Sequence, residues 1–168
     1  MKRILPLLLA LAFILSACGG KDEGAQKTPE ELNKAYAEAI TAAQSQDERD
    51  AFPQIAPDDE MFELVLGTMG ITPEDLTAPA LMVSVRGIQA YSVAALMPAE
   101  GKEDAVRQGL ETYIQNQKSN FQFYLEDQYQ IAADAKLEEL SDGTFLLVMC
   151  EGQDKVFDSI KAALEGGG

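Results

Sequence analysis

Apolar residues recur at helical spacing in two stretches between residues 28 and 70, and both stretches predict helices. The first follows Thr28–Glu31, which has the form of a capping box with a proline in the first turn. Its apolar face consists of Leu32, Tyr36, Ala39, Ile40 and Ala43. This helix should end in the polar run 44–50, and a loop is expected over 51–57. A second helix should begin at Asp58, where three acidic residues suit the positive end of the helix dipole, and end near Gly70.

Farther along the chain, dense apolar runs separated by turn residues predict strands. The runs 81–85 and 90–97 are joined across a link that contains Gly87, which indicates a hairpin. From Lys102 the spacing becomes helical again, and one apolar face continues for about 23 residues. This face is formed by Val106, Leu110, Tyr113, Phe121 and Tyr124, with Gln117 as its only polar member. The helix should break near 125–128, where a short turn begins.

A second pair of strands and a last helix complete the pattern. The strands are expected over 135–140 and 144–150, because Ser141-Asp142-Gly143 is a strong turn signal, and the helix is expected over 153–165. This order predicts an α+β fold: a two-layer antiparallel sheet (ββαββα order) with helices on one face, preceded by two N-terminal helices. The run 145–150 is apolar on both sides of its strand, so the second face needs a cover. Either the N-terminal helices or a partner protein would supply it.

The N-terminus has the features of an export signal. Lys2 and Arg3 precede the apolar run Ile4–Leu15, which is shorter than the roughly 20 residues that a membrane-spanning helix needs. The run ends in Leu15-Ser16-Ala17-Cys18, which closely resembles the lipobox of bacterial lipoproteins. This resemblance implies a diacylglyceryl group on the sulfur of Cys18 and cleavage before it. Two acyl chains attach a protein stably, at about 0.8 kcal/mol per buried methylene.

These signals divide the chain into four segments. We expect a lipoprotein signal peptide over 1–17, a flexible tether over 18–27, an N-terminal helical segment over 28–78 and an α+β domain over 79–165. The glycine-rich, charged tether would span on the order of 15–18 Å. The protein is therefore expected on the outer face of the bacterial cytoplasmic membrane, with the membrane as a partner through the diacylglyceryl anchor on Cys18.

The charge balance and the missing residue types exclude several functions. The chain has 13 basic and 28 acidic residues, a net charge of −15, so it repels nucleic acid and no nucleic-acid partner is expected. It contains no histidine, which excludes Ser-His-Asp and Cys-His catalysis and histidine-based zinc sites. Of the two cysteines, Cys150 has no basic neighbour to activate it, and it is expected to be a small buried apolar residue rather than a reactive thiol.

Three further segments carry a family resemblance. They are "GITPEDL" (70–76), "YLEDQYQIAADAK" (124–136) and "DGTFLLVMC" (142–150). Together with the lipobox they resemble the uncharacterised lipoproteins of Gram-positive, Clostridia-like gut bacteria grouped as domain-of-unknown-function family 4358. The resemblance implies lipid anchoring and a mixed helix and strand fold, and it supplies no catalytic residues. The family usually has a proline where this chain has Glu126.

Two chemical functions have candidate residues in the sequence. A carboxylate-based enzyme would need a pair of acids, for which Asp58/Asp59, Glu126/Asp127 and Glu138/Glu139 are available. A calcium site would need oxygen ligands that converge, and the nearest cluster is 47–50, which contains an arginine and lacks a glycine turn. We expect these carboxylates to be surface or helix-end charges, and we predict no catalytic, cofactor-binding or metal-binding residues.

By elimination, a binding or scaffold module is the expected function, with an envelope protein or peptide as a possible partner and a solute as the alternative ligand. The candidate surface is aromatic: Tyr91, Tyr113, Phe121, Phe123, Tyr124 and Tyr129. These residues are alternatively the core between the helices and the sheet. Binding predicts a continuous exposed apolar patch or groove.

Overall fold

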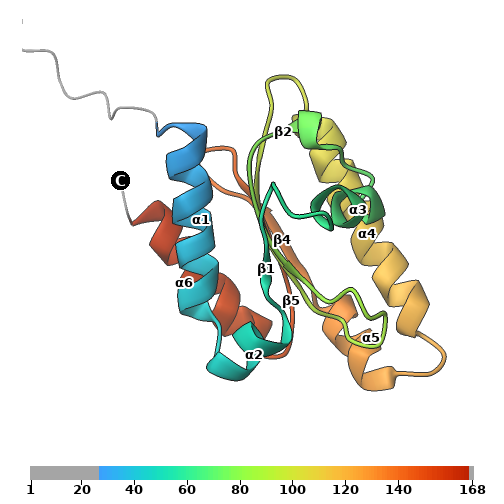
Figure 1. Cartoon of the computed structure of the whole chain (residues 1–168). Coiled ribbons are helices and arrows are strands. Elements are labelled where there is room, and N and C mark those ends of the chain that lie inside the picture. Colours follow the sequence, from blue (N-terminus) through green and yellow to red (C-terminus); the bar gives the residue numbers. More distant parts are fainter. Residues whose placement is uncertain (1–26, 167–168) are drawn as a thin grey trace, which may run out of the picture.

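The computed structural model describes residues 27–166, in which a five-stranded antiparallel sheet lies between two layers of helices (Figure 1). In chain order the elements are α1 (Pro29–Ala43), α2 (Gln46–Ala51), β1 (Gln54–Ile55), α3 (Phe62–Thr68), the 3-10 turn η1 (Pro73–Asp75), β2 (Leu76–Val83), β3 (Ser92–Pro98), α4 (Glu103–Phe121), α5 (Glu126–Ala133), β4 (Lys136–Glu139), β5 (Phe145–Met149) and α6 (Gln153–Glu165).

The strands lie in the order β1-β2-β3-β5-β4, and each pairs antiparallel with its neighbour. Both predicted pairs are present, β2 with β3 and β4 with β5. The central contact between β3 and β5 joins the two pairs into one sheet. The α+β class and the ββαββα order are therefore confirmed, with α5 as a short additional helix before β4.

The helices cover both faces of the sheet, which corrects the expected arrangement with helices on one face. Helices α1 and α6 lie on one side, and α3, α4 and α5 lie on the other (Figure 1). The cause is visible in β5, where all five residues are buried. Leu146 and Val148 belong to the core under α1 and α6, while Phe145 and Leu147 belong to the core under α4. A strand that is apolar on both sides is stable only between two covers.

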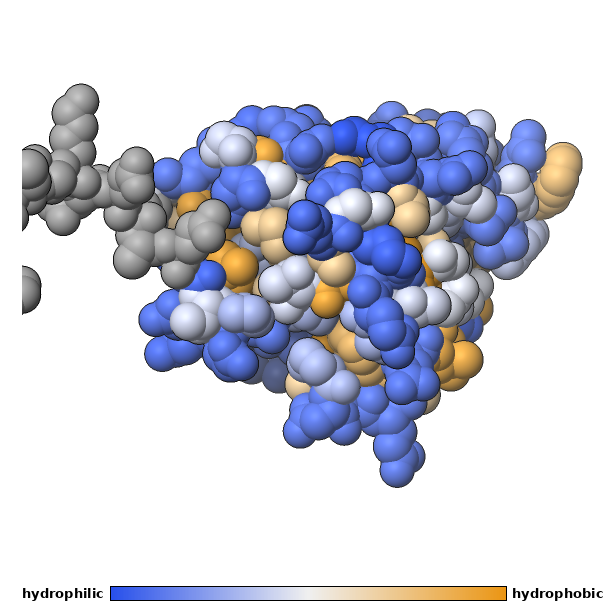
Figure 2. All heavy atoms as spheres, turned by 90° about the horizontal axis from the view of Figure 1, so that it is seen from above, coloured by the Kyte–Doolittle hydropathy of each residue, from blue (hydrophilic) through white to orange (hydrophobic). Residues whose placement is uncertain are grey.

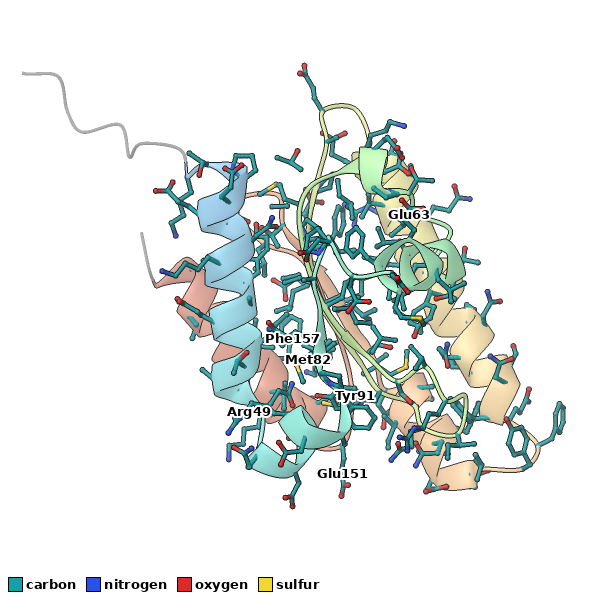
Figure 3. The ribbon with its side chains drawn as sticks, in the orientation of Figure 1. Arg49, Glu63, Met82, Tyr91, Glu151 and Phe157 are labelled. Atoms are coloured by element: carbon teal, nitrogen blue, oxygen red, sulfur yellow. The ribbon has the colours of Figure 1, made fainter. Side chains whose placement is uncertain are left out.

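The layer under α1 and α6 contains a buried polar contact that fixes α1 to the sheet. The hydroxyl of Tyr36 lies 2.6 Å from Oγ1 of Thr144, just before β5. Burial raises the pKa of Tyr36 to about 12, so the hydroxyl stays protonated and the hydrogen bond is maintained. Met82 and Phe157 fill the same layer lower in the sheet (Figure 3).

Several element bounds differ from the sequence prediction. The polar run after α1 forms α2, whose start is capped by Ser45. Strand β2 begins at Leu76 and includes Pro79. The outer strand β1 pairs only with Leu81 and Met82, so it does not extend to Pro79. At such a free edge the missing N–H of proline leaves no ladder partner unsatisfied. Helix α4 ends at Phe121, three residues earlier than expected.

Candidate functional site

Six large apolar side chains are exposed among residues 27–166, and they come from three segments of the chain. The segments are the start of α3, the β2–β3 loop and the α4–α5 connection. We call these six residues the distal patch: Met61, Leu64, Val85, Ile88, Phe123 and Tyr124. Their exposed fractions range from 36% for Met61 to 88% for Phe123.

A hollow of about 340 Å³ lies in the middle of the distal patch. Four patch residues line it, together with buried Val65 and Tyr113 at its floor and the amides of Gln117 and Asn120 on α4. A second hollow of about 400 Å³ adjoins the first, because both are lined by Met61 and Val85. The patch is therefore concave, with an apolar floor and a few amide groups at its side.

Hydrogen bonds and packing hold the three segments of the distal patch in place. The N–H of Ala90 in the β2–β3 loop donates to Oε1 of Gln128 on α5 at 2.8 Å. The ring of Tyr124 packs on the buried ring of Phe121, with 6.4 Å between centroids. At the start of α3, the N–H of Met61 donates to Oδ1 of Asp59 at 2.8 Å.

Two segments of the distal patch, the β2–β3 loop and the α4–α5 connection, lie at the opposite end of the sheet from the start of the described chain, and α3 lies beside the sheet between the two ends (Figure 1). Lys27 lies with Thr77 and Pro98, near the start of β2 and the end of β3, around a hollow of about 820 Å³. The β2–β3 loop of the distal patch lies beyond the other ends of these two strands. The eight residues of β2 separate the two ends by about 25 Å. Figure 2 looks onto the end that contains residue 27, which is largely hydrophilic with separate apolar areas.

The predicted aromatic surface is divided between the core and the distal patch. Tyr91, Tyr113 and Phe121 are buried, and Tyr129 is half-buried against the core under α4. Phe123 and Tyr124 are exposed and belong to the distal patch. Sequence reasoning missed the other four members of the patch. The sequence pattern places Val85 in the strand 81–85, and Met61 and Leu64 in the helix expected from Asp58 to Gly70.

The three candidate carboxylate pairs each serve structural contacts. Glu138 pairs with Lys161 on α6, whereas Glu139 pairs with Arg107 on α4, so these two neighbours are bound on opposite faces of β4. Asp59 accepts the N–H of Met61, as described above. Asp127 accepts a hydrogen bond from the amide of Gln128, which holds its pKa below the usual range.

The candidate calcium cluster 47–50 forms the body of α2. Glu48 accepts hydrogen bonds from the N–H and hydroxyl of Ser45, and Asp50 accepts one from Gln46. The guanidinium of Arg49 donates to the carbonyl oxygens of Thr41 and Gln44. Across the described part of the chain, no three Cys, Asp or Glu side chains are grouped as a metal site.

Cys150 lies at the end of β5 in the core under α1 and α6, with 2% of its surface exposed. Burial, with smaller contributions from the nearby charges of Glu48 and Glu151, raises the pKa of its thiol to about 12. The thiolate is the nucleophilic form of cysteine, so this position disfavours reactivity.

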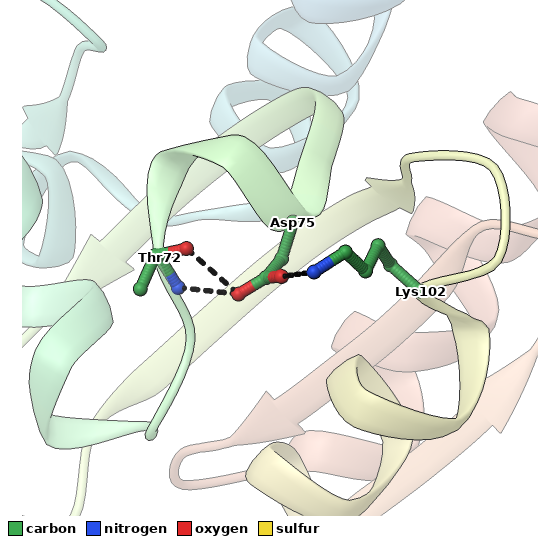
Figure 4. A network of polar contacts seen from close by, with 3 residues as sticks. All are labelled: Thr72, Asp75 and Lys102. Atoms are coloured by element: carbon green, nitrogen blue, oxygen red, sulfur yellow. Dashed lines mark hydrogen bonds and ion pairs between the residues drawn. The ribbon is translucent and has the colours of Figure 1, made fainter.

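The segment "GITPEDL" connects α3 to β2 and fixes this connection to α4. Gly70 has φ +69°, which ends α3 in a conformation that favours glycine. Oδ2 of Asp75 accepts from the N–H and the hydroxyl of Thr72, and Oδ1 accepts from Nζ of Lys102 at 2.7 Å (Figure 4). Lys102 and Thr72 hold the pKa of Asp75 at about 2. The residues of this segment therefore stabilise the connection between α3 and β2.

The predicted anchor, Cys18, lies outside the described residues. None of the helices between residues 27 and 166 combines the length and the apolar character needed to cross a bilayer.

Comparison with known proteins gives one similarity. The family model described as "Domain of unknown function (DUF4358)" matches residues 63–150, about half of the chain, from α3 to the end of β5. No curated protein and no solved structure matches the chain significantly.

Proposed function

We propose that this chain, which belongs to the family described as "Domain of unknown function (DUF4358)", is a lipid-anchored envelope lipoprotein that acts as a non-catalytic binding module. The anchor is a diacylglyceryl group on Cys18, supported by the lipobox Leu15–Cys18. Its place is the outer face of the cytoplasmic membrane of a Gram-positive bacterium, as the lipobox and the family resemblance suggest. The observation that carries the binding role is the concave distal patch.

The position of the distal patch fits a protein that is held at its N-terminus. The described chain starts at one end of the sheet, and the β2–β3 loop of the patch lies about 25 Å away at the other end. A tether on Cys18 would therefore leave the patch free to face away from the membrane. The net charge of −15 also disfavours contact between the domain and anionic lipids.

A solute-binding role is the second candidate, and the hollow beside residue 27 favours it. Its volume of about 820 Å³ falls in the range of small-molecule sites. Leu32, Met97 and Leu164 contribute apolar lining, while Glu100 and Asp142 contribute carboxylates. A solute bound there should raise the melting temperature of the protein in a concentration-dependent way.

Two experiments in intact cells test the proposal. Cys18→Ser should abolish incorporation of labelled fatty acid and release the protein from the membrane fraction. For the binding role, Leu64 is replaced by a photo-reactive benzoylphenylalanine in the full-length protein, with the same replacement at Glu100 as the control at the other end. A discrete protein adduct from position 64 but not from position 100 supports the proposal. Adducts only to lipid or to a second copy, or no adduct, contradict it.

A further inference from the structure

We infer that the distal patch binds a basic, amphipathic helix presented by another envelope protein. This inference rests on the binding role proposed above and specifies the chemistry of the partner. Four of the six residues, Met61, Leu64, Val85 and Tyr124, are exposed around one hollow and so form a continuous apolar surface. Continuous exposed apolar surfaces with a polar rim commonly mark interaction sites.

The shape of the patch favours a helix over an extended strand. The hollow of about 340 Å³ lies between α3, the second half of α4 and the β2–β3 loop. The edge strand β1 lines the neighbouring hollow and not this one, so this groove is formed mainly by side chains of two helices and a loop. An amphipathic helix in a groove uses apolar anchors that repeat every three or four residues. The hollow has room for one or two such anchors beside Met61, Leu64 and Tyr124.

The patch is held in one arrangement before any partner binds. The contact from Ala90 to Gln128 fixes the β2–β3 loop on α5, and the packing of Tyr124 on Phe121 fixes the α4–α5 connection. Binding to such a surface avoids part of the entropic cost of ordering loops and side chains. The three segments therefore form a preorganised site.

The charges around the patch select a basic partner. Asp50 and Asp59 line the second hollow, Glu60 directly precedes Met61 in the chain, and Glu126 and Asp127 follow Tyr124 by two and three residues. The cations nearby in the sequence are Arg86 in the β2–β3 loop and Lys118 in the last turn of α4. An excess of negative charge at the rim attracts lysine and arginine and disfavours acidic partners.

The same charges argue against two other occupants. A second copy of the chain would bring its own carboxylates against these carboxylates, and like charges across an interface are costly. An anionic lipid surface would be repelled for the same reason. A partner with an apolar face and basic edges satisfies both the hollow and its rim.

The test uses the full-length lipoprotein in phosphatidylcholine nanodiscs and fluorescent peptides of about 18 residues, which form five helical turns. The probe is an amphipathic leucine–lysine helix. One control peptide has the same apolar face with glutamate in place of lysine, and a second is a scrambled leucine–lysine sequence. Empty nanodiscs correct for binding of each peptide to lipid, and fluorescence anisotropy measures the affinity.

We expect saturable binding of the leucine–lysine helix alone. Leu64→Asp and Tyr124→Asp should each weaken it at least about tenfold, because both remove apolar contacts at the centre of the patch. Glu60→Gln should weaken it about twofold, with a larger effect at low salt, whereas the matched change Glu30→Gln at the other end, near the start of α1, should have no effect. Both patch residues are exposed, so circular dichroism of the two variants should match that of the unmodified protein.

Three results would overturn the inference: equal binding of the glutamate peptide, unchanged affinity in folded Leu64→Asp and Tyr124→Asp variants, or no binding of the leucine–lysine helix. If position 64 still forms a protein adduct in cells while the peptide does not bind, the binding role stands and only the basic helical partner is wrong. If the adduct is also absent, the binding role itself fails.

Discussion

Replacing Gly109 by alanine is expected to destabilise the fold, although alanine is the better helix former. Gly109 lies within α4 where the helix meets the end of α3 and Ile71. A Cβ atom at this position would lie 2.6 Å from the carbonyl oxygen of Met69 and 2.9 Å from Cγ1 of Ile71. The first contact is with backbone, so the two elements must move apart to admit the methyl group.

The magnitude follows from two opposing terms. Alanine gains about 1 kcal/mol over glycine within a helix. Forcing an extra methyl group into a packed contact costs about 1–3 kcal/mol, and a backbone neighbour places this site in the upper part of that range. The net loss in the free energy of unfolding should therefore be about 1–2 kcal/mol. Gly67 in α3 provides the matched control, because a Cβ there has no atom within 4 Å and the same substitution should stabilise the protein by about 0.5 kcal/mol.

Urea unfolding followed by far-ultraviolet circular dichroism measures both variants. With a slope of about 2 kcal/mol per molar urea, Gly109→Ala should lower the midpoint by about 0.5–1 M and Gly67→Ala should raise it slightly. The opposite signs separate packing from helix propensity. A midpoint that rises in both variants would show that α4 and α3 are not in the close contact described here.

Three further predictions concern single side chains. Tyr36→Phe should reduce the free energy of unfolding by about 1–2 kcal/mol, because it leaves Oγ1 of Thr144 buried without its partner. The double variant Tyr36→Phe/Thr144→Val should lose less stability than the sum of the two single changes. Additive losses would refute the contact. The pKa of Asp75 is lowered from 3.8 to about 2, so its contribution to stability is present above pH 3.8 and is lost as the pH falls through about 2. Over this pH range the melting temperature of Asp75→Asn should decline less than that of the unmodified protein. Parallel curves of melting temperature against pH would contradict the pairing with Lys102. In a Cys18→Ser background, Cys150 should react with a thiol reagent at least about 100-fold more slowly in the native protein than in urea, and equal rates would show that the thiol is accessible.

Much of the fold follows from local patterns in the sequence. Helix α6 has the predicted bounds, 153–165, because its apolar residues recur on one face and a glycine precedes them. Helix α2 was missed because it has no buried residue and therefore no periodic apolar signal. Its Ser45–Glu48 capping box was nevertheless visible in the sequence. The local pattern of α6 does not specify which face of the sheet this helix covers. That depends on which helices cover each face of β5.

The distal patch shows why surface sites are harder to predict. Tyr124 continues the helical spacing that includes Phe121, so it was expected on the same apolar face. Helix α4 ends at Phe121, so Tyr124 does not continue its apolar face. Phe121 is therefore 1% exposed, whereas Tyr124 is 63% exposed. Val85 and Ile88 are exposed for a related reason, since β2 ends at Val83 and leaves them in a loop. The position at which an element ends thus decides which apolar residues reach the surface.

The lipid anchor on Cys18 is the central claim, and intact mass spectrometry of the protein extracted from its own membrane tests it most directly. We predict a polypeptide that begins at Cys18 and has the added mass of a diacylglyceryl group. A free thiol at Cys18, or a chain that retains residues 1–17, would contradict the account.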